Sequence, residues 1–168
     1  DFQNLMHVYL DAVFYPNIYH HDMTFRQEGW HYEMENVDSD LTMNGVVYNE
    51  MKGAFSSPDD VLEREILNSL FPDNAYSEES GGDPDHIPEL TYEHYLDMHR
   101  TYYHPSNSYI YLYGDMDMAE KLVFIDEHYL SSYEKLDMDT DVANQRAFSE
   151  PREIRKQYSV SEGEELKD

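Results

Sequence analysis

The apolar positions of this chain recur mostly at helical spacing. Over residues 2–13 they fall on one helical face, with Asp1 as a candidate N-cap and Pro16 as the stop, which predicts a helix. Ser57, followed by a proline and two acids, is a strong helix start and predicts a helix that ends at Phe71. The same signals predict further helices over 22–28, 91–103 and about 117–133.

Few segments alternate as strands do. Trp30, Tyr32 and Met34 alternate with polar residues before a turn at 36–40, and "SYIYLYG" (108–114) is the clearest strand. Both faces of 108–114 are apolar, which favours a covered sheet strand over a surface that stacks ligands. Residues 152–160 are a third candidate strand, and 72–90 are predicted as a long loop. Two or three strands are too few for an ordinary sheet in a domain of this size. The protein is therefore either mostly α, or its sheet is completed by sequence outside residues 1–168.

Composition narrows the possible partners. The chain has 168 residues, no cysteine and a formal net charge of -25. Such a charge argues against nucleic acid and against an anionic membrane, since both require basic patches. No apolar run approaches a membrane span, and no signal peptide is visible. The chain begins at Asp1, inside a helical pattern and without methionine, so we expect a piece of a longer protein.

One acid stands within an apolar stretch, "GVVYNEMKGAF" (45–55). On a helical wheel, Glu50 lies about 60° from Val47, between Val46 and Ala54, which predicts a buried carboxylate. A buried ionised carboxylate requires a cation, a hydrogen-bond network or a proton.

Two interpretations of Glu50 remain open on geometry alone. The first is an ion pair with one of the few arginines, for which the candidates are Arg26, Arg64 and Arg100, or an acid at the edge of the apolar arc that reaches water. The second is a metal ligand in a cleft, where Gly53 and Ala54 leave room.

The stretch resembles a signature of the pitrilysin/insulinase-type zinc metallopeptidases, in the presequence-protease and falcilysin branch. The resemblance continues in order over most of the chain and is weakest over 134–149. Its further blocks are "DFQNLMHVYLDAVFYP" (1–16), "FRQEGWHYEMEN" (25–36), "LFPDNAYSEESGGDPDHIPELT" (70–91), "YYHPSNSYIYLYGD" (102–115) and "EPREI" (150–154).

The resemblance implies a zinc ion held by two histidines of an HxxEH helix and by a distant glutamate, which matches Glu50. The glutamate inside HxxEH would be the general base. Residues 1–168 contain no HxxEH, so the resemblance implies an internal fragment without a catalytic residue of its own and without bound zinc.

The implied fold class is α+β: the helix-rich part of a metallopeptidase α/β domain with an incomplete sheet. We expect 1–133 to be the later part of the zinc-binding domain, 134–151 a linker, and 152–168 the start of the next domain or a tail.

Other candidate sites are weaker. His20 and His21 are adjacent, and His94 and His99 are five residues apart without the intervening glutamate, so neither pair forms the zinc motif. "DMDTD" (137–141) begins like a calcium loop but has Val142 where that loop requires glycine. "SGGDP" (80–84) lacks the lysine of a phosphate loop and is typical of a turn.

Two functions follow as hypotheses. The first is a segment of a zinc endopeptidase that degrades unstructured peptides in a closed chamber, with the rest of the same polypeptide as its partner. The second is a non-catalytic homologue that acts as a structural or peptide-holding subunit.

We expect the protein to be cytoplasmic if the source is bacterial and to lie in an organelle lumen if the source is eukaryotic. Bare strand edges would make residues 1–168 alone self-associate.

Overall fold

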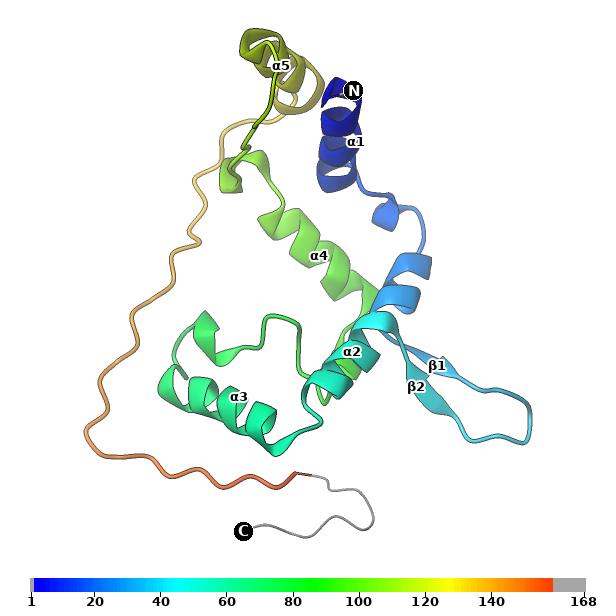
Figure 1. Cartoon of the computed structure of the whole chain (residues 1–168), viewed down its shortest axis with the longest axis vertical. Coiled ribbons are helices and arrows are strands. Elements are labelled where there is room, and N and C mark those ends of the chain that lie inside the picture. The colour runs from blue at the N-terminus through cyan, green and yellow to red at the C-terminus, as the bar shows by residue number, and fades with distance from the viewer. Residues whose placement is uncertain (1, 159–168) are drawn as a thin grey trace. The chain divides into compact units, whose positions relative to one another are not determined.

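The structure is a computed structural model that describes residues 2–158. The chain divides into two compact units, which we describe separately (Figure 1). Unit 1 comprises the residues up to Phe25 together with Leu90–Thr140, and unit 2 comprises Arg26–Glu89 together with the residues from Asp141 onward.

Helices form most of the regular structure. The α-helices are α1 (Phe2–Phe14), α2 (Val46–Ala54), α3 (Pro58–Leu70), α4 (Tyr92–Tyr102) and α5 (Met118–Ile125). Two π-helical turns lie at Phe25–Gly29 and Asp126–Leu130, and short 3-10 turns lie at Asn17–Tyr19, Ala75–Ser77, Ile87–Glu89 and Pro105–Asn107. A two-stranded antiparallel sheet joins β1 (His31–Glu33) to β2 (Thr42–Asn44).

The predicted helix starts are confirmed by their caps. The Ser57 hydroxyl accepts a hydrogen bond from the Asp60 amide at 3.3 Å and starts α3, and the Thr91 hydroxyl does the same for the His94 amide at the start of α4. The Asp117 carboxylate accepts from the Glu120 amide at 3.1 Å, which starts α5. These bonds satisfy amides that the first helical turn leaves without a partner. The predicted cap at Asp1 lies outside the described residues.

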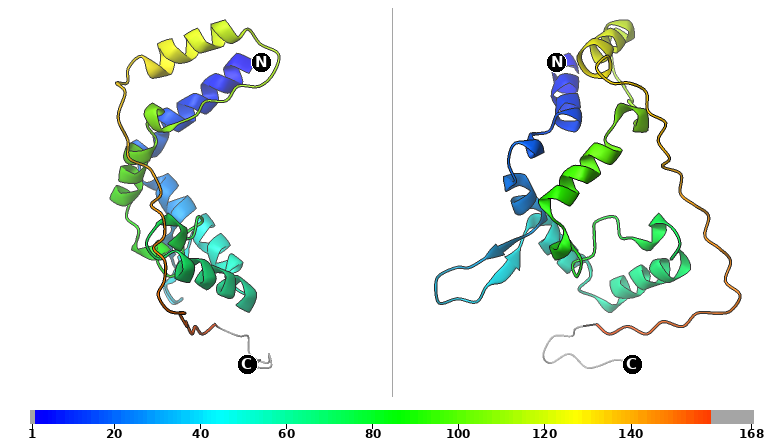
Figure 2. Two further views of the ribbon diagram at one scale, coloured as in Figure 1. Left: turned by 90° about the vertical axis from the view of Figure 1, so that its left-hand side faces the viewer. Right: turned by 180° about the vertical axis from the view of Figure 1, so that it is seen from behind.

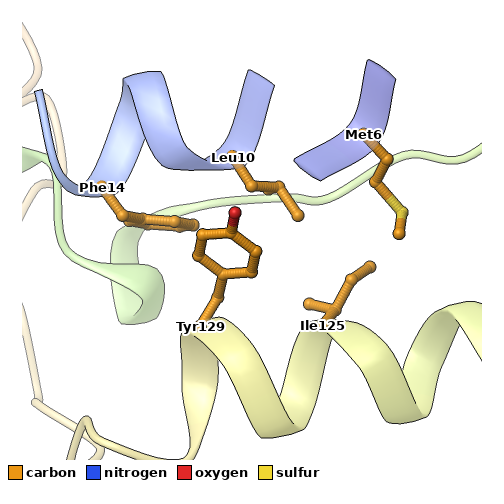
Figure 3. Packing of buried hydrophobic residues seen from close by; sticks show 5 residues of the cluster. All are labelled: Met6, Leu10, Phe14, Ile125 and Tyr129. Carbon is orange, nitrogen blue, oxygen red and sulfur yellow. The ribbon is translucent and has the colours of Figure 1, made fainter. Parts of the chain in front are cut away.

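The core of unit 1 lies between α1 and α5. Ile125 and Tyr129 are 3% and 2% exposed, and they pack against three α1 side chains one helical turn apart, namely Met6, Leu10 and Phe14 (Figure 3). The Tyr129 hydroxyl points toward α1, where it donates to the His7 carbonyl at 2.8 Å. Burial of this aromatic ring with its hydroxyl paired joins two helices that are distant in sequence.

A histidine links α4 to the end of α1. The His99 ring contacts the Tyr19 hydroxyl through Nδ1 at 2.6 Å and the Val13 carbonyl through Nε2 at 2.9 Å. Because a carbonyl only accepts, Nε2 carries the proton and Nδ1 accepts from Tyr19. His99 is therefore a structural side chain within unit 1.

Unit 2 contains the β1–β2 hairpin, which leads directly into α2 (Figure 1). Its register pairs His31 with Asn44 and Glu33 with Thr42, across the predicted turn at 36–40. β2 was not predicted, because Leu41 and Met43 alone give too short an alternation. At the end of β2, the Asn44 side chain accepts from the Gly45 amide at 2.8 Å and from Asn49 Nδ2 at 2.5 Å. Asn44 therefore fixes the direction in which α2 leaves the hairpin.

The prediction of a paired strand at 108–114 is wrong for the described residues. The segment belongs to no sheet there, although its position beside α1 is fixed by the partly buried Leu112. Tyr109, Tyr111 and Tyr113 are 105%, 83% and 83% exposed, so the predicted covering of both faces is also absent. A strand is stable only with neighbours, and its pattern cannot state whether they are present.

The C-terminal part of the described chain contains no helix or strand. Residues 134–158 are irregular, which corrects the predicted strand over 152–158; its last two residues, 159 and 160, lie outside the described residues (Figure 2). Arg152 and Lys156 still attach this segment to α3, through the Ser69 carbonyl at 3.0 Å and the Glu65 carboxylate at 3.2 Å. The fold class is confirmed as helix-rich with a small sheet.

Replacing Ile125 tests the α1–α5 core. We expect Ile125→Ala to lower the free energy of unfolding by about 2 kcal/mol or more, because it leaves a cavity among buried side chains. Leu122→Ala on the same helix is the matched control, since Leu122 is exposed, and its effect should stay below about 0.5 kcal/mol. Urea unfolding followed by circular dichroism measures both. Equal effects of the two substitutions would contradict the assignment of this core.

Candidate functional site

The site is built around α2, whose orientation is set by its buried face. Tyr48 and Met51 of α2 form a small cluster with Ile87, against which Trp30, Val47 and Phe55 are partly buried. Trp30 therefore contributes to the packing around α2. This cluster anchors one side of α2 within unit 2.

Two glycines permit close approach of backbone and side chains to α2. A Cβ at Gly45 would lie 2.1 Å from the Gly29 carbonyl oxygen, so only glycine fits between the hairpin and α2. A Cβ at Gly81 would lie 2.3 Å from Met51 Sδ. Gly81 belongs to the "SGGDP" loop, which was predicted to be a turn. The structure shows that this loop packs against the buried face of α2.

The opposite face of α2 carries Glu50 and is exposed. Glu50 lies among Val46, Gly53 and Ala54, all of which are exposed, and Val46 reaches 51%. The expected burial of this carboxylate is therefore wrong for the described residues, and the alternative of an acid that reaches water is the one observed. The helical wheel took Val47 as the centre of the buried arc, whereas the packed arc is centred nearer Tyr48 and Met51. Glu50 is thus surrounded by small or apolar residues on the exposed side of α2.

Two of the three arginines proposed as partners of Glu50, Arg64 and Arg100, have other partners. Arg64 lies 3.3 Å from Asp83 and 3.5 Å from Glu65, with its guanidinium 4.5 Å from the centre of the Phe55 ring. Arg100 pairs with Asp97 at 2.7 Å. Within residues 2–158, no hydrogen bond or ion pair of Glu50 is present. Its carboxylate is therefore available to a group outside these residues.

The donor set does not by itself fit a zinc ion. A catalytic zinc site takes three protein ligands and leaves one position for water. A carboxylate such as Glu50 is a suitable ligand, but residues 2–158 contain no group of three or more histidine, aspartate or glutamate side chains placed to hold a metal. A complete site would require ligands from elsewhere.

Two further histidines have local partners. The His104 ring accepts from the Ser106 amide at 3.1 Å and caps a short turn. His86 pairs with Glu89 at 3.2 Å, and this hydrogen bond raises the pKa of the imidazole. Residues 137–141 are irregular and exposed apart from Met138.

Several tyrosines of unit 1 have a pKa above the usual value for a phenol. Burial, and then a hydrogen bond with Tyr15, raises the pKa of Tyr133 to about 12. Burial also raises the pKa of Tyr129, and the Asp11 carboxylate adds to this effect. Tyr129 belongs to the α1–α5 core and Tyr133 lies beside it, against Phe14, so a negative charge on either phenol would be poorly solvated.

No helix among the described residues is long and apolar enough to cross a lipid bilayer.

The described residues are helix-rich with one small sheet, and sequence comparison identifies the family. A family profile described as the peptidase M16 inactive domain matches residues 89–167. "Protein HypA" of Clostridium perfringens is 54% identical over 166 residues, which is 99% of this chain and 17% of that protein. Presequence protease 1, chloroplastic/mitochondrial, of Arabidopsis thaliana is 44% identical over 99% of this chain and 16% of its own length. The mitochondrial presequence protease of Drosophila melanogaster is 46% identical over 90% of this chain and 15% of its own length.

The chain belongs to the M16 peptidase family and is homologous to presequence proteases over nearly all of its length. This confirms the resemblance carried by the stretch around Glu50. The chain spans about a sixth of the length of these relatives. The division of the sequence at 134–151 stays a prediction.

Alkaline pH tests the surroundings of Tyr133. A phenol with a raised pKa stabilises the folded state below its unfolded pKa of about 10, and this contribution is lost as pH rises through its folded pKa of about 12. We expect the wild-type chain to lose stability between these values and Tyr133→Phe to lose less. Urea unfolding at pH 9 to 12, roughly the range of these two pKa values, measures this difference. The exposed Tyr113→Phe is the control and should follow the wild type.

Proposed function

We propose that this chain is a segment of a zinc-dependent endopeptidase and that Glu50 supplies the carboxylate ligand of its zinc ion. The observation that carries the proposal is the exposure of Glu50 on a helix whose other face is anchored by Tyr48 and Met51. The similarity to presequence proteases supports it. The substrates would be unstructured peptides, degraded in a closed chamber formed with the rest of the polypeptide.

The geometry of α2 suits a ligand that meets groups from another segment. Gly53 and Ala54 beside Glu50 carry no bulk, so a second helix could approach closely. Anchoring of α2 by the hairpin and by the loop at Gly81 restricts the position of the carboxylate before a metal arrives. Such restriction lowers the entropic cost of ligation. When bound, zinc would lower the pKa of a water molecule and polarise the scissile carbonyl.

The other parts of the site would come from outside residues 1–168. The chain contains no HxxEH sequence, so two histidine ligands and the general base must be supplied by other residues of the longer protein. A bacterial source would place the enzyme in the cytoplasm. A eukaryotic source would place it in an organelle lumen, because the plant relative is described as chloroplastic/mitochondrial.

The alternative is a non-catalytic homologue that holds peptides or supports a partner. One observation favours it, namely the match of residues 89–167 to a domain described as inactive. Glu50 lies outside that range. The sequence encoded immediately before Asp1 separates the two functions, since an intact HxxEH there supports the peptidase and a disrupted motif supports the scaffold.

Substitution of Glu50 tests the zinc role in the longer protein. We expect Glu50→Gln to lower kcat/KM for an unstructured peptide by at least about 100-fold and to reduce bound zinc, because a neutral amide is a poor zinc ligand. Glu63→Gln on α3 is the matched control, since Glu63 is also an exposed helical acid of unit 2. Peptide cleavage and metal analysis measure both effects. Normal zinc content in the Glu50 variant would exclude the proposed ligation.

Residues 1–168 alone should not hydrolyse peptides. The reason is the missing HxxEH, without which the described residues offer one carboxylate and no neighbouring ligand group. A fluorogenic unstructured peptide, incubated with the purified chain and zinc, gives the measurement. Cleavage that depends on zinc and is abolished by a chelator would contradict this prediction.

A further inference from the structure

Three side chains form a hydrogen-bonded bridge between the β1–β2 hairpin and α2. Asn44 is the last residue of β2, and its Oδ1 accepts from Asn49 Nδ2 of α2 at 2.5 Å and from the Gly45 amide at 2.8 Å. Its Nδ2 donates to Glu33 Oε2 of β1 at 2.5 Å. The amide of Asn44 is thus used on both sides, as an acceptor toward α2 and as a donor toward β1.

The place of this bridge in the sequence explains its effect on the helix. Gly45 is the N-cap of α2 and provides no side-chain cap, so Asn44 immediately precedes the cap and Asn49 is the fourth residue of the helix. A pair of residues at these two positions fixes the angle at which a chain enters a helix, usually through an apolar contact. Here a hydrogen bond takes the place of that contact. The bridge therefore holds the direction of α2 relative to the hairpin (Figure 1).

Glu50 follows Asn49 directly, so the location of its carboxylate depends on the direction of α2. The carboxylate is exposed, and the buried side chains Tyr48 and Met51 lie on the other side of the helix. Gly45 and Glu50 are about 7.5 Å apart along the helix axis, at roughly 1.5 Å per residue. A change of about 10° in helix direction would move the carboxylate by about 1.3 Å, whereas a functional group has to stand within about 0.5 Å of its productive position.

We propose that Asn44 is a positioning residue for Glu50, on which it acts through Asn49 with the support of Glu33. This inference rests on the proposed function of Glu50 as a metal ligand. The bridge requires one acceptor atom and one donor atom in the same side chain. An amide provides both, whereas aspartate at position 44 would place a second carboxylate against that of Glu33. Glu33 and Asn49 are exposed, so their hydrogen bonds compete with water and add little to the stability of the whole fold.

Exchanging the amide and the carboxylate tests the bridge in the longer protein. We expect Asn44→Asp to raise the zinc dissociation constant by about 10-fold or more, because two adjacent carboxylates repel and change the direction of α2. The double variant Glu33→Gln/Asn44→Asp should restore the wild-type affinity, since the introduced glutamine amide can donate to the introduced carboxylate. Competition with a chelating dye measures the zinc dissociation constant of each protein.

The sign of the change separates an effect of position from an effect of charge. An additional carboxylate near the site would by itself attract a divalent cation and lower the zinc dissociation constant. A rise in that constant therefore indicates displacement of the ligand. Asn68→Asp on α3 is the matched control, because Asn68 is also partly exposed in unit 2, and it should leave the zinc affinity unchanged.

Amide hydrogen exchange of the metal-free longer protein gives a measurement that does not involve zinc. The Gly45 and Asn49 amides should exchange at least about 5-fold faster in Asn44→Asp, the factor that corresponds to one lost hydrogen bond. The double variant should return both amides to the wild-type rate. Amides of α4, in the other unit, should exchange alike in all three proteins.

Three outcomes would overturn the proposal, and they are distinguishable. An unchanged zinc dissociation constant in Asn44→Asp, together with loss of zinc in Glu50→Gln, would show that Glu50 is a ligand that needs no help from Asn44. A loss of affinity that the double variant does not restore would assign the effect to general destabilisation. Normal zinc content in Glu50→Gln would remove the proposed function itself, and with it the role of Asn44.

Discussion

Tyr129 and Ile125 hold α1 against α5, and the uncovered surface of unit 1 follows from that contact. A helix that buries only one narrow side behaves as a surface helix, but α1 has apolar residues on a second side as well. Leu5 and Tyr9 on that side flank the groove beside 108–112. The contact with α5 therefore leaves the apolar side of α1 that carries Leu5 and Tyr9 beside the extended segment 108–112.

In unit 2, helix α2 is likewise held by packing along one side, and this packing leaves Glu50 on the exposed side. The bulky side chains Tyr48 and Met51 take the core position, and glycine at 45 and 81 allows the hairpin and a loop to close around that face. Glu50 is then exposed as a consequence of the packing on the opposite side. An acid on the free face of an anchored helix needs no buried cation, in agreement with the pairing of Arg64 and Arg100 with other acids.

The sequence was sufficient where the determining interactions are local. The helix starts at Ser57, Thr91 and Asp117 depend on a side chain that reaches an amide three residues away, and all three are observed. The strand at 108–114 and the burial of Glu50 depend on distant partners, and both predictions were wrong. A helical wheel places residues by polarity alone. It does not predict that Tyr48 is buried in a cluster with Ile87 while Val47 is only partly buried. The close contact between Gly81 and Met51 likewise requires a loop to fold back, for which no sequence signal exists.

The two wrong predictions have a common physical meaning. In each, the residue pattern specifies burial that the described residues do not provide: two apolar faces at 108–114, and an apolar arc around Glu50. A sequence under selection for the surface of a free-standing domain would place polar side chains at such positions, since exposed apolar patches promote aggregation. The strongly acidic remainder of the chain shows that polar surface is abundant elsewhere. The pattern is therefore consistent with faces that groups outside the described residues cover, as the proposed role of Glu50 requires.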